Sequence, residues 1–363
     1  MEMNLKTKLA LAAVAFYASS AIAAEHTISG NFDVGIANVT DNGTYMQQGD
    51  LADHSKIVFS GSDDLGGGLT AFYRLSAGFD QNGGSANGGN VSANGTLFSR
   101  ESKVGISGAF GTFTFGQQLS PYILSGVLVN QLVGQFYVNR LIMAGGLGAA
   151  AVGCTSCSTL GLAGAGGTRA QVGGFFIPNS IQYQTPAISG FKVTALVGMD
   201  NGSNDGALVL PGAEDPNDSY TSIAIDGAVE GINIHAATQS RKDMYSTYVI
   251  GTKVPVGEAF SITANYMNHE DEGLDSIGSY AFGGRYEMGG GISLVAQYAN
   301  ADYADSQTLT NFAVLYALSK STTVYFTTTR GTNGANPTLA DRARWSPSGD
   351  SKTATSIGIN HAW

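Results

Sequence analysis

Two pairs of residues have the types and spacing that could support chemistry. Asp63 and Asp64 are adjacent carboxylates, suited to acid–base work or to a metal, and Cys154 and Cys157 form a C-T-S-C motif, suited to a redox pair or half of a metal site. The aspartates stand in a glycine-rich turn, where Asp commonly caps the backbone. The cysteines have Gly- and Ala-rich flanks and no nearby histidine. We interpret the aspartates as turn residues, and the cysteines as either a local disulfide or two free thiols.

The chain lacks the common motifs of enzyme active sites. Its five histidines are scattered without an H-x-x-x-H spacing, and no G-x-S-x-G nucleophile elbow or phosphate-binding loop occurs. A membrane-embedded lipase or protease would need a Ser/His or Asp/His constellation, and no such spacing is present. We therefore predict that the protein is not an enzyme and has no cofactor or metal.

The composition favours a protein with an apolar exterior. Only 13% of the residues are charged, against about 25% in ordinary soluble domains, and 17 Phe plus 16 Tyr could form aromatic girdles at a membrane interface. The formal net charge is −10, and residues 1–23 contribute +1, so the remainder carries −11. This charge argues against nucleic acid as a partner and weakly favours cations near an opening of the protein.

The first 23 residues have the order of a secretory signal peptide. Lys6 and Lys8 precede an apolar run over residues 9–17, and Ala21 and Ala23 supply the small residues of a cleavage site. The run is too short for the roughly 20 residues of a spanning helix. We predict cleavage after Ala23 and a single domain over residues 24–363.

Alternating apolar and polar residues recur along the rest of the chain. In the first such run Ile28, Phe32, Val34 and Ile36 alternate with polar residues, and about sixteen similar runs follow one another, joined by alternately short and long connections. The long connections include residues 40–53, 80–96 and 118–177. This pattern predicts an all-β fold, a 16-stranded antiparallel transmembrane β-barrel. A secreted β-sandwich used for adhesion is the soluble alternative.

Several segments resemble the general porins of Gram-negative bacteria. They are residues 27–35 (TISGNFDVG), 55–66 (SKIVFSGSDDLG), 101–108 (ESKVGISG), 110–118 (FGTFTFGQQ), 179–183 (NSIQY) and 316–322 (YALSKST). The resemblance implies a homotrimer in the outer membrane, in contact with its lipid bilayer and lipopolysaccharide. It also implies that the long third loop, residues 118–177, folds into the lumen and narrows the pore.

The end of the chain resembles the terminal strand that the barrel-assembly machinery of this family reads. It runs GINHAW, with Trp363 where the family usually has Phe. We therefore assign Ile359, His361 and Trp363 to an assembly signal, with the assembly machinery as a partner.

Charged residues on the lumen-facing parity predict the lining of the constriction. Lys56 and Lys103 also match basic wall positions of the family, whereas Arg74 rests on parity alone. Asp33 and Glu101 have the same parity and could supply carboxylates.

The third loop departs from the family pattern. Between Gln117 and Pro178 it has no Asp or Glu, and its cations are Arg140, which we assign to the constriction, and Arg169. Porins commonly place loop carboxylates opposite basic wall residues. Because these carboxylates are missing here, we expect weak or unusual ion selectivity. Arg100 has outward parity, which favours an interfacial or subunit-contact position.

The function expected from these features is passive diffusion of small hydrophilic solutes and ions through a water-filled pore. A substrate-specific channel of the same fold, for sugars or organic acids, is the alternative. Such channels line their path with aromatic residues, and Phe72 and Tyr325 have lumen parity.

Overall fold

A computed structural model describes most of the strand-forming part of the chain. The described residues are 25–41, 43–48, 51, 55–79, 97–98, 100–128, 131, 176–199, 219–242, 245–271, 276–302, 306–332 and 351–363. The predicted signal peptide, Arg140, Arg169, Cys154 and Cys157 lie outside these ranges.

Among the described residues there are seventeen strands and one helix. The elements are β1 (Glu25–Val39), β2 (Gly43–Gln48), β3 (Ser55–Gly66), β4 (Leu69–Phe79), β5 (Glu101–Gly108), β6 (Gly111–Leu119), α2 (Pro121–Leu128), β8 (Phe176–Gln184), β9 (Phe191–Gly198), β10 (Tyr220–Val229), β11 (Ile232–Arg241), β12 (Tyr245–Val256), β13 (Phe260–Asp271), β14 (Ile277–Gly289), β15 (Ile292–Ala301), β16 (Gln307–Ala317), β17 (Thr322–Thr332) and β18 (Lys352–Ala362). In this part of the chain no helix has the length and hydropathy needed to cross a membrane.

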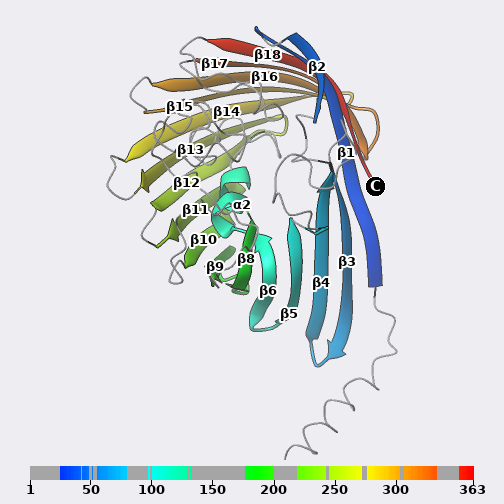
Figure 1. The fold of residues 1–363 in the computed structure, drawn as a ribbon, viewed down its shortest axis with the longest axis vertical. Coiled ribbons are helices and arrows are strands. Elements are labelled where there is room, and N and C mark those ends of the chain that lie inside the picture. The colour runs from blue at the N-terminus through cyan, green and yellow to red at the C-terminus, as the bar shows by residue number, and fades with distance from the viewer. Residues whose placement is uncertain are drawn as a thin grey trace, which may run out of the picture.

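The strands form one closed antiparallel sheet. Each strand from β3 to β18 pairs with its neighbour along the chain, and β18 pairs with β1 over Asn31 to Val39 (Figure 1). β2 and β3 both pair with β1, at its two ends, so they share one position in the wall. The wall therefore has sixteen strand positions, and the predicted 16-stranded barrel is confirmed.

The predicted alternation of side chains matches the two faces of the wall. In β1 the outward-facing Ile28 and Ile36 are 62% and 52% exposed, whereas Ala37 on the inner face is fully buried. Successive residues of a strand point to opposite faces, so a period of two separates an outer apolar surface from the lumen. Branched and aromatic side chains outside fit contact with hydrocarbon.

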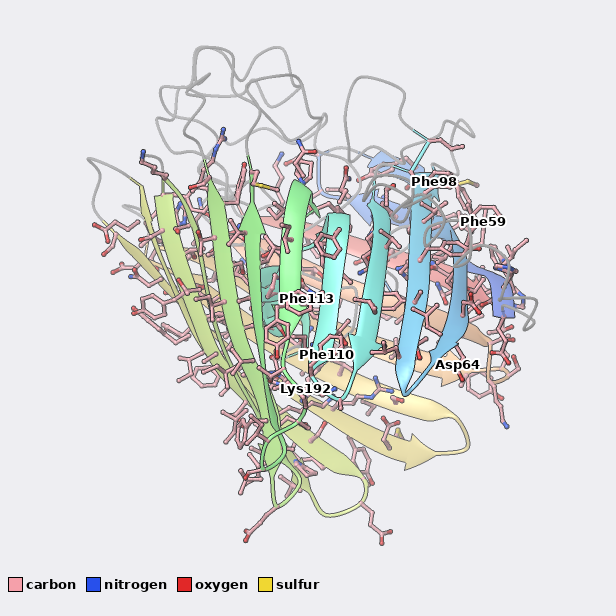
Figure 2. The ribbon with its side chains drawn as sticks, turned by 90° about the horizontal axis from the view of Figure 1, so that it is seen from below. Phe59, Asp64, Phe98, Phe110, Phe113 and Lys192 are labelled. Atoms are coloured by element: carbon pink, nitrogen blue, oxygen red, sulfur yellow. The ribbon has the colours of Figure 1, made fainter. Side chains whose placement is uncertain are left out.

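Short glycine-rich turns connect neighbouring strands at one end of the barrel. The β3–β4 turn has three consecutive glycines at positive φ, Gly66, Gly67 and Gly68, and Asp64 Oδ1 accepts a hydrogen bond from the Gly66 amide at 2.9 Å. This capping role agrees with the turn interpretation of Asp64. Figure 2 shows Asp64 at the end of the barrel where the short turns lie.

The start of the third loop lies inside the barrel. α2 follows β6 directly and packs against β9, β10, β11 and β12, with Tyr122 and Ile123 fully buried in a cluster of inward-facing side chains (Figure 1). This confirms the predicted insertion for the start of the loop, and residues 132–175 of the predicted loop lie outside the described residues. The strands reach further than expected, because β6 continues to Leu119 and β8 begins at Phe176.

The last residue joins the two ends of the barrel wall. The Trp363 amide donates to Gly30 O at 3.1 Å, and the Gly30 amide donates to Trp363 O at 3.2 Å. A Cβ on Gly30 would lie 2.6 Å from the Trp363 ring, so glycine makes room for the indole. His361 Nδ1 hydrogen-bonds with Thr322 Oγ1 at 2.9 Å. These contacts extend the pairing of β18 with both of its neighbours.

Candidate pore constriction

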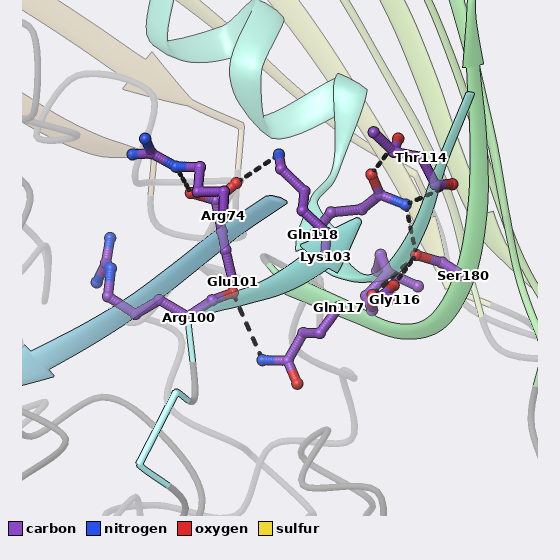
Figure 3. Close-up of polar contacts among 10 residues, drawn as sticks. Arg74, Arg100, Glu101, Lys103, Thr114, Gly116, Gln117, Gln118 and Ser180 are labelled. Atoms are coloured by element: carbon purple, nitrogen blue, oxygen red, sulfur yellow. Dashed lines mark hydrogen bonds and ion pairs between the residues drawn. The ribbon is translucent and has the colours of Figure 1, made fainter. Parts of the chain in front are cut away.

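Three charged side chains meet on the inner face of β4 and β5. Glu101 bridges two cations, because Arg74 Nε lies 2.6 Å from its Oε2 and Lys103 Nζ lies 2.6 Å from its Oε1 (Figure 3). Arg74 and Lys103 are directly opposite each other in the β4–β5 register, where like charges repel unless an anion separates them. The three residues, which we call the β4–β5 cluster, keep one surplus positive charge.

A bulge beside this cluster directs the chain into the lumen. The β6–β8 register shifts between Gly116 and Gln118, and Gly116 has a φ of +120°. Gln118 Nε2 donates to Ser180 Oγ at 3.1 Å, and Ser180 Oγ donates to Gly116 O at 2.7 Å (Figure 3). A Cβ on Gly116 would lie 2.2 Å from Ser102 O, so the position requires glycine. Because a bulge bends its strand, it sets the direction in which the third loop leaves β6.

Hydrogen bonds also hold α2 against the inner wall at β10 and β12. The Tyr122 hydroxyl hydrogen-bonds with Thr247 Oγ1 of β12 at 2.9 Å, and Ser125 Oγ donates to Asp226 Oδ1 of β10 at 2.8 Å. Burial raises the pKa of Tyr122 well above its ordinary value, so the hydroxyl remains protonated and able to donate. The first turns of the third loop are thus held by both packing and polar contacts.

A further contact holds the loop beyond α2. The side chain of Gln131 donates through Nε2 to Ser261 O of β13 at 3.0 Å. The backbone N–H of Gln131 donates to Gln297 Oε1 of β15 at 3.2 Å. The described part of the loop therefore contacts the inner wall from β9 to β15, on the side away from β4 and β5.

Asp33 lies inside the barrel but is enclosed. Its side chain is fully buried, Tyr325 donates a hydrogen bond to Oδ1 at 2.8 Å, and the Leu51 amide donates to Oδ2 at 3.0 Å. Leu51 also packs against a cluster of inward-facing residues that includes Leu315. The inward parity predicted for Asp33 is correct, but its carboxylate holds the chain between β2 and β3 and is not exposed to the lumen. Of the two predicted carboxylates, only that of Glu101 is partly exposed.

The two remaining basic residues of this wall both lie on the inner side. Lys56 is opposite the inward-facing Asn31 of β1. The outward position expected for Arg100 is wrong, because this residue is 5% exposed, its guanidinium lies 4.8 Å from the Phe176 ring, and its Cδ would lie 3.3 Å from a Cβ added to Gly78 on the inner face. Arg100 precedes the first β4–β5 pair, so the strand alternation does not extend to it.

A second charged cluster, whose residues are not among the predicted constriction residues, lies on the inner wall near the short turns. Arg285 Nε is 2.5 Å from Glu287 Oε1, Arg285 Nη2 donates to Ser293 Oγ at 3.0 Å, and Ser293 Oγ donates to the other Glu287 oxygen. Lys253 is on the same inner face two strands away, level in the register with Gly283, which precedes Arg285 by two residues. We call Lys253, Arg285, Glu287 and Ser293 the β12–β15 cluster. The inward parity of Lys253 and Glu287 was the signal that could have identified them.

Comparison with known proteins agrees with this architecture. The family model described as Gram-negative porin matches residues 10–336. No curated protein matches the sequence significantly. Among solved structures, the anion-selective porin from Comamonas acidovorans aligns with a TM-score of 0.71 at 20% identity, over 94% of this chain and 100% of that one.

Two further solved structures show the same fold. The trimer form of OmpT, an outer membrane protein of Vibrio cholerae, aligns with a TM-score of 0.61 at 13% identity, over 94% of this chain and 100% of that one. OmpF of Salmonella typhi, in complex with daunomycin, aligns with a TM-score of 0.59 at 12% identity, over 93% and 97% of the two chains.

Proposed function

The chain belongs to the Gram-negative porin family, and from this we propose that it is a general diffusion channel of the outer membrane whose constriction favours small anions over cations. Membership of the family makes the protein an outer-membrane channel for passive diffusion. The preference for anions and the lack of a specific substrate are our proposal.

The β4–β5 cluster is the observation that supports an anion preference. It holds two cations for one carboxylate, and Arg74 is the most exposed of the three, at 39%. A lumen wall with one sign of charge concentrates solutes of the opposite sign. The third loop has no Asp or Glu between Gln117 and Pro178 that could offset this charge.

The acidic net charge of the chain favours cations, in the opposite direction to the proposed anion preference. Several carboxylates stand at the short turns and strand ends, among them Asp63, Asp64 and Glu258, so they act near the mouths. In a narrow pore the nearest charges dominate, because salt screens the distant ones within about 8–10 Å. The similar porin from Comamonas acidovorans is described as anion-selective, but at 20% identity that likeness covers the fold alone.

The reversal potential across a planar bilayer tests this proposal. With a KCl gradient across a single purified channel, we expect chloride to permeate about two to five times as readily as potassium. A preference for potassium would overturn the proposal. Conductance that saturates with one sugar or organic acid, and is inhibited by it, would favour the substrate-specific alternative.

We also propose that the channel is a homotrimer assembled through the terminal-strand signal Ile359, His361 and Trp363. The trimer form of OmpT supports the oligomeric state. Trp363 hydrogen-bonds to β1 through both its amide and its carbonyl, and its indole is 51% exposed. A terminal aromatic residue on the outer face is therefore available to an assembly factor before the barrel closes.

Deletion of Trp363 is expected to reduce assembly strongly. The wild-type chain should run as an SDS-resistant oligomer that dissociates on heating, and the deletion should lower the yield of that oligomer about tenfold. Trp363→Phe, which restores the usual aromatic residue, is the control and should assemble normally. Full assembly of the deletion variant would contradict the assignment of Trp363 to the assembly signal.

A further inference from the structure

The β12–β15 cluster repeats the charge arrangement of the β4–β5 cluster. Each cluster has two cations and one carboxylate, but Glu101 pairs with both of its cations whereas Glu287 pairs with Arg285 alone. Both oxygens of Glu287 are already engaged, one by Arg285 and one by Ser293. Within the described residues Lys253 has no hydrogen-bond or ion-pair partner, although it is only partly exposed. The surplus positive charge of this cluster is therefore centred on Lys253.

The two clusters lie on opposite walls. Counting β2 and β3 as one position, β5 is the fourth strand position of the barrel and β14 is the twelfth, so eight positions separate them in either direction around the sixteen. The two clusters are therefore diametrically opposite each other in the barrel wall.

The clusters also lie at different depths. Lys103 is five residues before Gly108, which ends β5 at a short turn, whereas Lys253 is three residues before Val256, which ends β12 at a short turn. The two-residue difference corresponds to about 7 Å along the strands. The β12–β15 cluster is therefore the nearer of the two to the short-turn end of the pore.

We infer that Lys253 and Arg285 form a second anion-binding station for a small oxyanion, a carboxylate or phosphate group. The ammonium of Lys253 and the guanidinium of Arg285 can both donate charge-assisted hydrogen bonds to such a group. This inference rests on the proposed anion preference and adds to it, because two stations at different depths make binding from the two ends of the pore unequal.

Lys253→Gln is the sharpest test, since it removes a charge without breaking a hydrogen bond in the described structure. Inorganic phosphate or acetate is added to one compartment of a bilayer at a time, and the reduction of chloride current is measured. We expect each oxyanion to reduce the current more from the short-turn side, and Lys253→Gln to weaken that effect about threefold. Lys320→Gln, at the exposed β16–β17 turn of the same end, is the matched control and should behave like the wild type.

The outcomes separate this inference from the proposed function. A wild-type channel that prefers chloride, but whose block by phosphate and acetate is unchanged in Lys253→Gln, overturns the second station and leaves the anion preference intact. A wild-type channel that prefers potassium overturns the anion preference itself. Weaker block by either oxyanion in Lys253→Gln, with normal block in Lys320→Gln, supports the station.

Discussion

Replacing Arg74 and Lys103 together with alanine is expected to turn a preference for chloride into a preference for potassium. The double variant leaves the carboxylate of Glu101 without either of its ion-pair partners, so the charge of the cluster changes from +1 to −1. A unit charge acts on an ion about 8 Å away with about 0.5 kcal/mol in water, so a change of two charges corresponds to about 1 kcal/mol, or about a fivefold change in local ion concentration.

The measurement is the reversal potential in a KCl gradient, and two further variants serve for comparison. Glu101→Gln changes the cluster in the opposite direction, from +1 to +2, and should strengthen the preference for chloride. Lys320→Ala removes a charge from an exposed turn outside the lumen and should leave the reversal potential unchanged. If the Arg74/Lys103 double variant still prefers chloride, the selectivity arises elsewhere and the assignment of the constriction is wrong.

Most of the barrel could be predicted from the sequence, because each strand carries its own alternation. β2 is the exception. Its sequence, GTYMQQ, has little apolar alternation, and the strand lies within the predicted long connection 40–53. The strand forms because residues Val34–Val39 of β1 offer unpaired backbone groups to it. A strand that forms because of its pairing partner is therefore hard to predict from its own alternation.

The residues of the candidate site were easier to predict than their contacts. Parity predicts the inner face for Arg74, Glu101 and Lys103, since it depends only on local spacing. Whether an inward carboxylate is exposed depends on distant segments. Asp33 is enclosed by Tyr325, which is 292 residues away in the sequence, and no local pattern contains that contact.

The insertion of the third loop could be inferred only from the resemblance, because its own residues have no strand pattern. The structure gives the physical reason for the insertion: a glycine bulge at Gly116 turns the chain inward, and two buried apolar residues, Tyr122 and Ile123, follow shortly afterwards. A loop that places fully buried side chains against the inner wall resists leaving the lumen.

Tyr122→Ala is therefore expected to loosen the start of the third loop and widen the pore. Tyr122 is fully buried among inward-facing residues of the wall, and truncating a buried aromatic side chain typically costs about 3–5 kcal/mol of packing free energy. Because α2 is held mainly by this packing and a few hydrogen bonds, the loss should favour states in which α2 leaves the wall. We expect single-channel conductance to rise or to fluctuate between levels, with changes of roughly 1.5- to 2-fold.

A more conservative variant separates packing from hydrogen bonding. Tyr122→Phe keeps the ring and loses only the hydroxyl that contacts Thr247, so it should cost about 1 kcal/mol and leave the conductance close to that of the wild type. Liposome swelling with sugars of increasing size gives a second readout, in which Tyr122→Ala should admit larger sugars than Tyr122→Phe. Equal conductance and an equal size limit in both variants would mean that α2 does not narrow the path, and that the size limit is set elsewhere in the channel.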